Sequence, residues 1–196
     1  MSLGLLGFET TIASPFTLDG IGVHSGLRVS ASFSPAEAGT GIVFQRVGPN
    51  GVIAELKAVA ASVGNTDLCT VLGFSPARSI ATVEHVMAAL YALGIDNVVI
   101  EIDGSEVPVM DGSSQAFVEA IGQAGIKSLG VKRRYIRVLK ETRVDNGTSW
   151  ARFTPYEGTR FEVEIEFPCP LIGRQAWRGD INAVSFRNEL SRARTF

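Results

Sequence analysis

The chain has 196 residues, of which 45% are hydrophobic and 19% charged, a composition typical of a globular protein rather than a disordered or fibrous one. Its 18 basic and 20 acidic residues give a net charge of -2, so a surface for nucleic acid or an anionic membrane is not expected. This length allows one large domain or two domains of about 100 residues each.

The N-terminal segment MSLGLLGFETT lacks a basic region and has only a short apolar run, so neither a signal peptide nor a membrane anchor is expected there. No other stretch approaches the roughly 18 consecutive apolar residues that a transmembrane segment requires. Cys69 and Cys169 lack the spacing of a metal site, and without an export signal they favour reduced thiols over a disulfide. These features predict a cytoplasmic protein.

Strand and helix patterns alternate in the first part of the chain. The stretch LRVSASFS (27–34) alternates apolar and polar residues, as a strand with one buried face does. Further strands are predicted at 41–47, 67–74 and 97–103, because each stretch is rich in β-branched or aromatic residues and bounded by turn residues. One helix is predicted from Thr82, and another after the turn at 111–113.

The basic, glycine-containing segment at 127–135 predicts a linker, and a second run of strands follows it in YIRVLKETRV, WARFTP and FEVEIEF. The final NELSRARTF predicts the beginning of a helical or loop segment. The stretches SGLRVSASFSP (25–35) and NGTSWARFTP (146–155) share a glycine, a strand and an aromatic residue two positions before proline. They indicate either an internal repeat or a chance similarity. If the repeat is real, residues 130–196 hold only part of the second copy.

The helix predicted in TVEHVMAALYALG carries two adjacent polar residues, Glu84 and His85, near its start. Its other face is built from small alanines and offers no charge to solvent, which predicts a helix covered on both sides, with Gly94 ending it. Its apolar stripe consists of Val83, Val86, Met87, Leu90 and Leu93.

Thr82 is the candidate N-cap, which places Glu84 and His85 in the first turn. The helix dipole stabilises a carboxylate there by roughly 0.3–1 kcal/mol and disfavours a protonated imidazole. We therefore expect His85 to be neutral, the form that binds a metal. Two interpretations stay open: Glu84 complements the dipole while His85 is a hydrogen-bonded core residue, or the pair belongs to a metal site.

Two further loops carry polar residues whose role depends on the fold. His24 lies in the glycine-rich LDGIGVHSG (18–26), where it can approach a ligand or pack against its own turn. Asp111 lies in EVPVMDGSSQAF, where it can form the turn and cap the second helix or join a site. These loops form one site only if they converge, which spacing cannot show.

The blocks GIGVHSG, DLCT, SIATVEHVMAAL, GIDNVVIEIDGSEVPVMDGSS and SRARTF occur in this order along the whole chain. The chain thereby resembles the zinc-dependent UDP-3-O-acyl-N-acetylglucosamine deacetylases, which commit a sugar nucleotide to lipid A synthesis in Gram-negative bacteria. The resemblance implies an α+β fold of two similar domains, each a β-sheet with a helix pair, with the helices sandwiched between the sheets. It implies a first domain at 1–129, which carries the Glu-His motif, and an incomplete second domain at 130–196.

The activity that the resemblance implies is hydrolysis of the N-acetyl amide of UDP-3-O-acyl-N-acetylglucosamine, which gives the free amine and acetate. In that reaction Glu84 is the general base and His85 a zinc ligand, an adjacency that lets the carboxylate receive a proton from metal-bound water. Thr195 matches the threonine whose hydroxyl stabilises the oxyanion. The positions that match the family's substrate site are His24, Leu68, Cys69, Glu166, Phe167 and Phe196.

The chain departs from the family in its metal ligands. The family takes its other two zinc ligands, a His and an Asp, from a segment beyond the Arg-Thr-Phe motif, and this chain contains only His24 and His85. Because catalytic zinc sites usually carry three protein ligands, Zn²⁺ is expected to bind weakly and the chain to be weakly active or inactive. The alternative is a non-catalytic remnant that binds a sugar nucleotide or a partner chain. The complete form is expected to be a monomer that binds the UDP-sugar acyl substrate.

Overall fold

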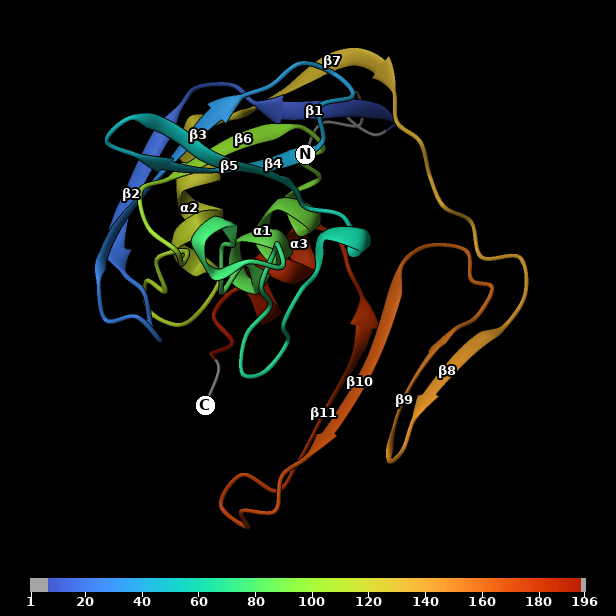
Figure 1. The fold of residues 1–196 in the computed structure, drawn as a ribbon. Coiled ribbons are helices and arrows are strands. Elements are labelled where there is room, and N and C mark those ends of the chain that lie inside the picture. Colours follow the sequence, from blue (N-terminus) through green and yellow to red (C-terminus); the bar gives the residue numbers. More distant parts are fainter. Residues whose placement is uncertain (1–6, 195–196) are drawn as a thin grey trace.

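The computed structural model of the chain describes residues 7–194 (Figure 1). Its largest sheet has five strands in the order β2-β3-β6-β4-β5. It lies in the part of the chain predicted to be the first domain, and this part keeps that name below. Its strands, in chain order, are β2 (Phe16–Ile21), β3 (Arg28–Pro35), β4 (Ile42–Gly48), β5 (Gly51–Lys57) and β6 (Val98–Ile102). Strand β6 lies between the hairpins β2–β3 and β4–β5, antiparallel to β3 and parallel to β4. The strands predicted at 27–34, 41–47 and 97–103 are therefore confirmed.

Two helices, α1 (Glu84–Leu93) and α2 (Gln115–Ala124), pack against each other and cover one face of this sheet (Figure 1). The ring of Phe33 in β3 stacks on the ring of Phe16 with a centroid distance of 4.4 Å. The centroid of the Phe117 ring in α2 lies 6.4 Å from that of Phe33. From α1, Leu90 and Leu93 are fully buried, as the predicted stripe requires. Because burial of one such side chain contributes roughly 1.5–3 kcal/mol, this core holds the helix pair on the sheet.

A small second sheet pairs β1 (Phe8–Ile12) with β7 (Ile126–Lys132) in antiparallel orientation. The linker predicted at 127–135 is therefore wrong over most of its length. The sequence pattern did not reveal this strand because its hydrogen-bonding partner, β1, lies at the other end of the domain in sequence. The predicted boundary between residues 129 and 130 falls inside β7, and the division into two domains stays a prediction.

The two ends of α1 differ in how well the sequence predicted them. Gly94 ends the helix with φ 73°, the left-handed conformation that glycine adopts without strain. The N-cap, however, is Val83 and not Thr82, and no side chain caps this end. The Thr82 hydroxyl instead donates to the Glu106 carboxylate at 2.9 Å, an acceptor that the local sequence does not reveal.

The outer face of α1 is only partly covered. Tyr91 is 57% exposed, and its ring meets the ring of Phe161 edge-on at a centroid distance of 6.5 Å. Phe161 belongs to the second half of the chain, which therefore touches the outer face of the helix at this ring but leaves Tyr91 more than half exposed.

The strand predicted at 67–74 is wrong, because these residues, all within the described part, form an irregular segment joined to its neighbours by isolated bridges at Leu72. Leu68 has φ 64°, a left-handed conformation that a strand cannot contain. The backbone N–H of Thr70 donates to the Glu84 carboxylate at 3.0 Å. A side chain from α1 thus overrides the β propensity of this stretch. Short 3-10 turns flank it, η2 (Ala60–Ser62) and η3 (Pro76–Arg78).

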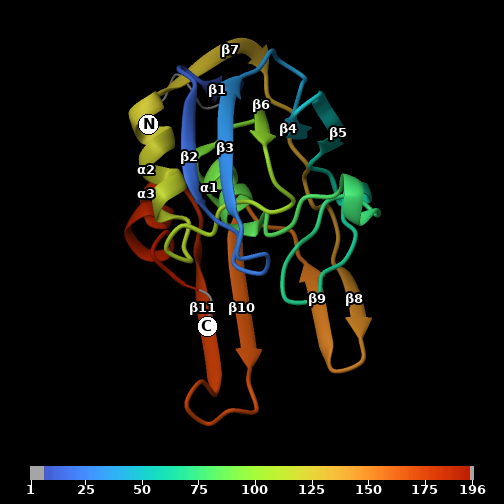
Figure 2. The ribbon, with the colours of Figure 1, turned by 60° about the vertical axis from the view of Figure 1, so that its left-hand side comes forward.

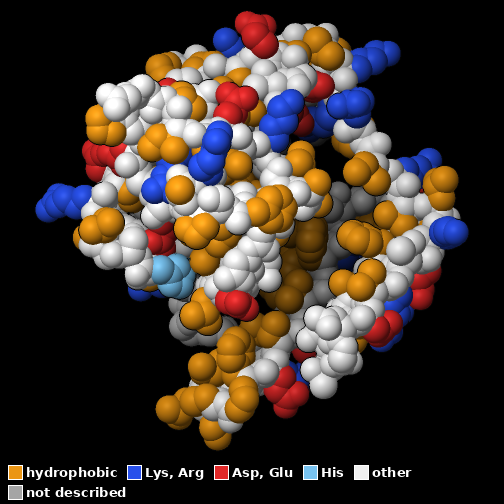
Figure 3. Space-filling view, in the orientation of Figure 1, with side chains coloured by type: hydrophobic (Ala, Val, Ile, Leu, Met, Phe, Trp, Pro, Cys, Tyr) orange, Lys and Arg blue, Asp and Glu red, His pale blue; other side chains and the backbone are white. Residues whose placement is uncertain are grey.

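Beyond β7 the chain forms two separate hairpins, which project from one end of the first domain (Figure 2). Their strands are β8 (Thr142–Asn146) with β9 (Ser149–Phe153), and β10 (Arg160–Glu166) with β11 (Arg174–Asp180). All residues of β8, β9 and β10 are exposed, including the apolar Phe161, Val163 and Ile165 of β10. Hydrophobic side chains line the hollow between the first domain and these hairpins (Figure 3).

The order of elements in the two halves supports the internal repeat. Hairpins β2–β3 and β4–β5 precede α1 in the first half, and hairpins β8–β9 and β10–β11 precede a short helix in the second. The two similar stretches lie on corresponding strands, β3 and β9. In the first half β6 joins the hairpins into one sheet, whereas within residues 7–194 no strand joins β9 to β10.

After β11 the chain returns to the first domain through a helical segment, as predicted for its last residues. Helix α3 (Ala183–Ser185) begins with an Asn182 capping box, and the π-helical turn η4 (Phe186–Leu190) follows it. Phe186 is 7% exposed and belongs to the first domain's core. The buried Ser191 hydroxyl donates to Gln115 of α2 at 2.6 Å. Over the described range 7–194, every helix is too short or too polar to cross a membrane.

Candidate functional site

Glu84 and His85 occupy the first turn of α1, where the prediction placed them. One oxygen of the Glu84 carboxylate, Oε2, accepts the backbone N–H of Thr70 at 3.0 Å. This bond holds the DLCT segment, with the exposed Leu68 and the partly buried Cys69, beside the start of the helix. The structure therefore brings four of the predicted site residues together, Glu84, His85, Leu68 and Cys69, and Cys69 carries a free thiol.

His85 connects α1 to the start of α2. Its backbone carbonyl accepts the Ser114 hydroxyl at 2.9 Å, which ties the N-terminal ends of the two helices together. Asp111, just before α2, accepts both the hydroxyl and the backbone N–H of Ser113, at 2.7 and 3.1 Å. These bonds, the hydroxyl first, hold the pKa of Asp111 below its ordinary value. Asp111 therefore forms the turn as predicted, but the N-cap position of α2 belongs to Ser114.

The His24 loop reaches the same region through Glu106, a residue that the sequence analysis did not identify. Glu106 is 3% exposed, and its carboxylate accepts the backbone N–H groups of His24 at 3.1 Å and Ser25 at 2.9 Å. It also accepts the Thr82 hydroxyl. Burial alone raises the pKa of Glu106, but these hydrogen bonds outweigh burial and hold the pKa below its ordinary value. The one signal in the sequence was a glutamate directly before the apolar residues VPVM.

Three residues in this region have backbone strain. Leu68, Thr82 and Met110 have φ values of 64°, 59° and 55°, and within residues 7–194 they are the non-glycine residues with positive φ. Each lies in a different motif, DLCT, TVEH or VMDG, and the contacts above join these segments. A non-glycine residue in this conformation costs roughly 1–3 kcal/mol and persists where the surrounding structure requires it, often at functional sites. The strained residues therefore lie in the same region as the Glu84-His85 pair and the DLCT segment.

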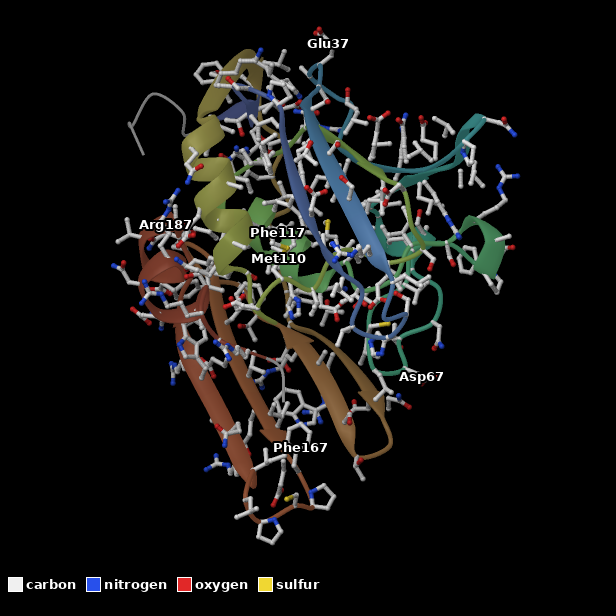
Figure 4. All side chains as sticks on the ribbon, turned by 90° about the vertical axis from the view of Figure 1, so that its left-hand side faces the viewer. Glu37, Asp67, Met110, Phe117, Phe167 and Arg187 are labelled. Carbon is white, nitrogen blue, oxygen red and sulfur yellow. The ribbon has the colours of Figure 1, made fainter. Side chains whose placement is uncertain are left out.

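The remaining predicted residues lie elsewhere or outside the described residues. Glu166 ends β10 and Phe167 follows it, near the tip of the hairpin and away from Met110 (Figure 4). The structure therefore does not bring these two residues to the Glu-His pair. Thr195 and Phe196 lie outside the described residues. Arg194, the last described residue, is close enough to Asp111 for its positive charge to contribute to lowering the pKa of that carboxyl.

A complete zinc site does not form among the described residues. Between residues 7 and 194, His, Cys, Asp and Glu side chains nowhere gather in a group of three or more that could hold a metal ion. His85 offers one imidazole, whereas a catalytic zinc ion usually has three protein ligands and an open position for water. This donor set does not fit the metal on its own.

Comparison with known proteins gives a consistent result over nearly the whole chain. The family model described as LpxC, UDP-3-O-acyl N-acetylglycosamine deacetylase, matches residues 9–196. Proteins named UDP-3-O-acyl-N-acetylglucosamine deacetylase from Brucella ovis, Brucella canis and Brucella abortus are 53% identical over 189 residues, 96% of this chain. The match covers 65% of the length of each relative.

Proposed function

Because this chain belongs to the family of UDP-3-O-acyl N-acetylglycosamine deacetylases, we propose that it supplies the Glu-His part of a deacetylase active site. The proposed reaction is hydrolysis of the N-acetyl amide of UDP-3-O-acyl-N-acetylglucosamine to the free amine and acetate, in lipid A biosynthesis. The observation that carries the proposal is the joining of the Glu84 turn, the DLCT segment and the His24 loop at one end of the first domain.

Glu84 is the proposed general base. The N–H of Thr70 binds Oε2 of its carboxylate, and the role proposed for the other oxygen, Oε1, is to take a proton from the water that attacks the amide carbonyl. The first turn of a helix favours the ionised carboxylate that this role needs. Thr195 is the proposed donor to the oxyanion of the tetrahedral intermediate, and the charge on that oxygen is what such a donor stabilises.

His85 is the proposed protein ligand of a zinc ion whose other His and Asp ligands come from outside residues 7–194. The greater length of the relatives supports this assignment, since the match leaves a third of each relative uncovered. The 196-residue chain itself is proposed to hold Zn²⁺ weakly and to be weakly active or inactive. The proposed substrate contacts are His24, Leu68, Cys69, Glu166, Phe167 and Phe196. The proposed setting is a monomer in the cytoplasm, where the free thiols of Cys69 and Cys169 stay reduced.

The test measures bound zinc, acetate release and UDP-sugar binding for the 196-residue chain, for Glu84→Gln and for the matched control Glu119→Gln, an exposed residue of α2. The glutamine at position 84 can still accept the Thr70 N–H but cannot take a proton. We expect substoichiometric zinc and, with added Zn²⁺, residual acetate release that Glu84→Gln abolishes and Glu119→Gln retains.

Two results would contradict the proposal. Tight stoichiometric zinc with full turnover from the 196 residues would overturn the argument from the missing ligands. Equal acetate release by Glu84→Gln and the unsubstituted chain would remove Glu84 as the base. Binding of the UDP-sugar without any turnover, unaffected by Zn²⁺, would favour the non-catalytic remnant instead.

A further inference from the structure

A buried carboxylate with no part in the proposed proton transfer lies beneath the candidate site. Oε1 of Glu106 accepts the His24 N–H at 3.1 Å and the Thr82 hydroxyl at 2.9 Å, and Oε2 accepts the Ser25 N–H at 2.9 Å. The three donors come from two segments that are more than 50 residues apart in the printed sequence. One side chain, 3% exposed, therefore joins the His24 loop to the residue that precedes the first turn of α1.

The His24 loop is shaped around this carboxylate. Its two N–H donors come from consecutive residues, an arrangement of backbone dipoles that binds anions. At Gly22 a Cβ atom would lie 2.3 Å from Glu106 Oε2, so a side chain at this position would require the carboxylate to move. The loop is closed on itself by backbone bonds from Gly22 to Leu27 and from Gly26 to Gly22.

Thr82 connects the Glu106 carboxylate to the start of α1. Its left-handed conformation, φ 59°, turns the chain immediately before Val83 and the Glu84-His85 pair. A β-branched residue is strained in this conformation, so the surrounding contacts must hold it there. Its hydroxyl donates a hydrogen bond to the charged Glu106, and this bond links the Thr82 side chain to another segment of the chain.

We propose that Glu106 is a positioning residue, whose ionised carboxylate fixes the His24 loop and the first turn of α1 relative to each other. Its effect on catalysis rests on the proposed function, whereas its effect on the geometry does not. Glu106 touches neither of the reacting groups, and it acts through Thr82 and through the backbone of His24.

The first test needs no activity. Glu106→Gln replaces two acceptor oxygens by one oxygen and an amide NH₂, so at least one of the three donors loses its partner. We expect amide hydrogen exchange at His24 and Ser25 to accelerate at least about tenfold, while β6 stays protected. The chain has two histidines, so their ring signals can be followed by NMR, and both are expected to shift. Glu101→Gln, an exposed glutamate on β6, is the control and should change neither.

The second test separates positioning from simple stability. In acetate release, Glu106→Gln is expected to lower kcat about 10- to 100-fold with little change in KM, because a misplaced base loses rate more than binding. If the unsubstituted protein releases no acetate, which the proposed function allows for this chain, the kinetic comparison does not apply and the exchange data alone decide the role of Glu106.

The inference is overturned if Glu106→Gln exchanges at His24 and Ser25 as slowly as Glu101→Gln does. Should Glu106→Gln fail to fold, Thr82→Val and Thr82→Ser test the same connection. The valine variant, which lacks the hydroxyl, should move the His85 ring signal and leave the Ser25 amide protected, and the serine variant should restore the signal. Identical spectra for both variants would also overturn it.

Discussion

Phe186 is the buried hydrophobic residue of the α3–η4 segment, with Ala183 and Leu190 packed around it, and Phe186→Ala should weaken the docking of this segment onto the first domain. Burying a phenylalanine contributes roughly 1.5–3 kcal/mol, and Phe186 is 7% exposed in the first domain's core. The Ser191 hydrogen bond to Gln115 adds only about 0.5–1.5 kcal/mol. Loss of the larger contribution corresponds to about a 10- to 100-fold fall in the docking equilibrium constant.

Hydrogen exchange measures this release residue by residue. In Phe186→Ala the amide of Ser191, which donates to the carbonyl of residue 186, should exchange about 10- to 100-fold faster while the amides of β3 and β6 stay protected. Val184→Ala is the matched control, because Val184 lies in the same α3–η4 segment and is 63% exposed. Its effect should be below about 0.5 kcal/mol. If Phe186→Ala instead accelerates β6 as much as Ser191, the segment is part of one cooperative unit and the reasoning fails.

Three further results are expected. Gly94→Ala should destabilise the domain by about 1 kcal/mol in urea unfolding because its φ is 73°, whereas Gly122→Ala, inside α2, should stabilise it by about 0.5–1 kcal/mol. The pKa of Glu106 is lowered in the folded state, so its stabilisation is present above the ordinary glutamate pKa of about 4.3 and lost as pH falls through the folded value. Glu106→Gln should therefore flatten the acid side of the stability profile. The amides of hairpin β8–β9 should exchange before those of β3, because all its residues are exposed.

Each of these has a result that would count against it. Equal signs for the two glycine variants would mean that backbone conformation does not decide their effect. An acid limb unchanged by Glu106→Gln would assign the pH dependence to other carboxyls, such as Asp111. Protection of β8–β9 equal to that of β3 would show contacts that cover the hairpin in solution.

Periodic local patterns determined much of the first domain. The stripe on α1 and its stop at Gly94, the alternation in β3, and the place of the Glu-His pair in a first helical turn could all be predicted from the sequence. Each of these depends on residues within a few positions of one another, and their burial follows from hydrophobic spacing. The strand in FEVEIEF likewise follows local alternation, but its pairing with β11, and whether a layer covers the hairpin, do not.

Only the tertiary structure decided how the motifs meet, because their contacts join residues far apart in sequence. The 67–74 stretch is not a strand because Glu84 binds its Thr70 N–H, and β7 is a strand because β1 pairs with it. Thr82 is turned away from its capping role by Glu106, a residue that no local pattern identifies. Local sequence patterns could identify the separate segments of the candidate site. The arrangement of these segments depends on the hydrogen bonds to a buried carboxylate, because a buried carboxylate must find its hydrogen-bond partners inside the fold.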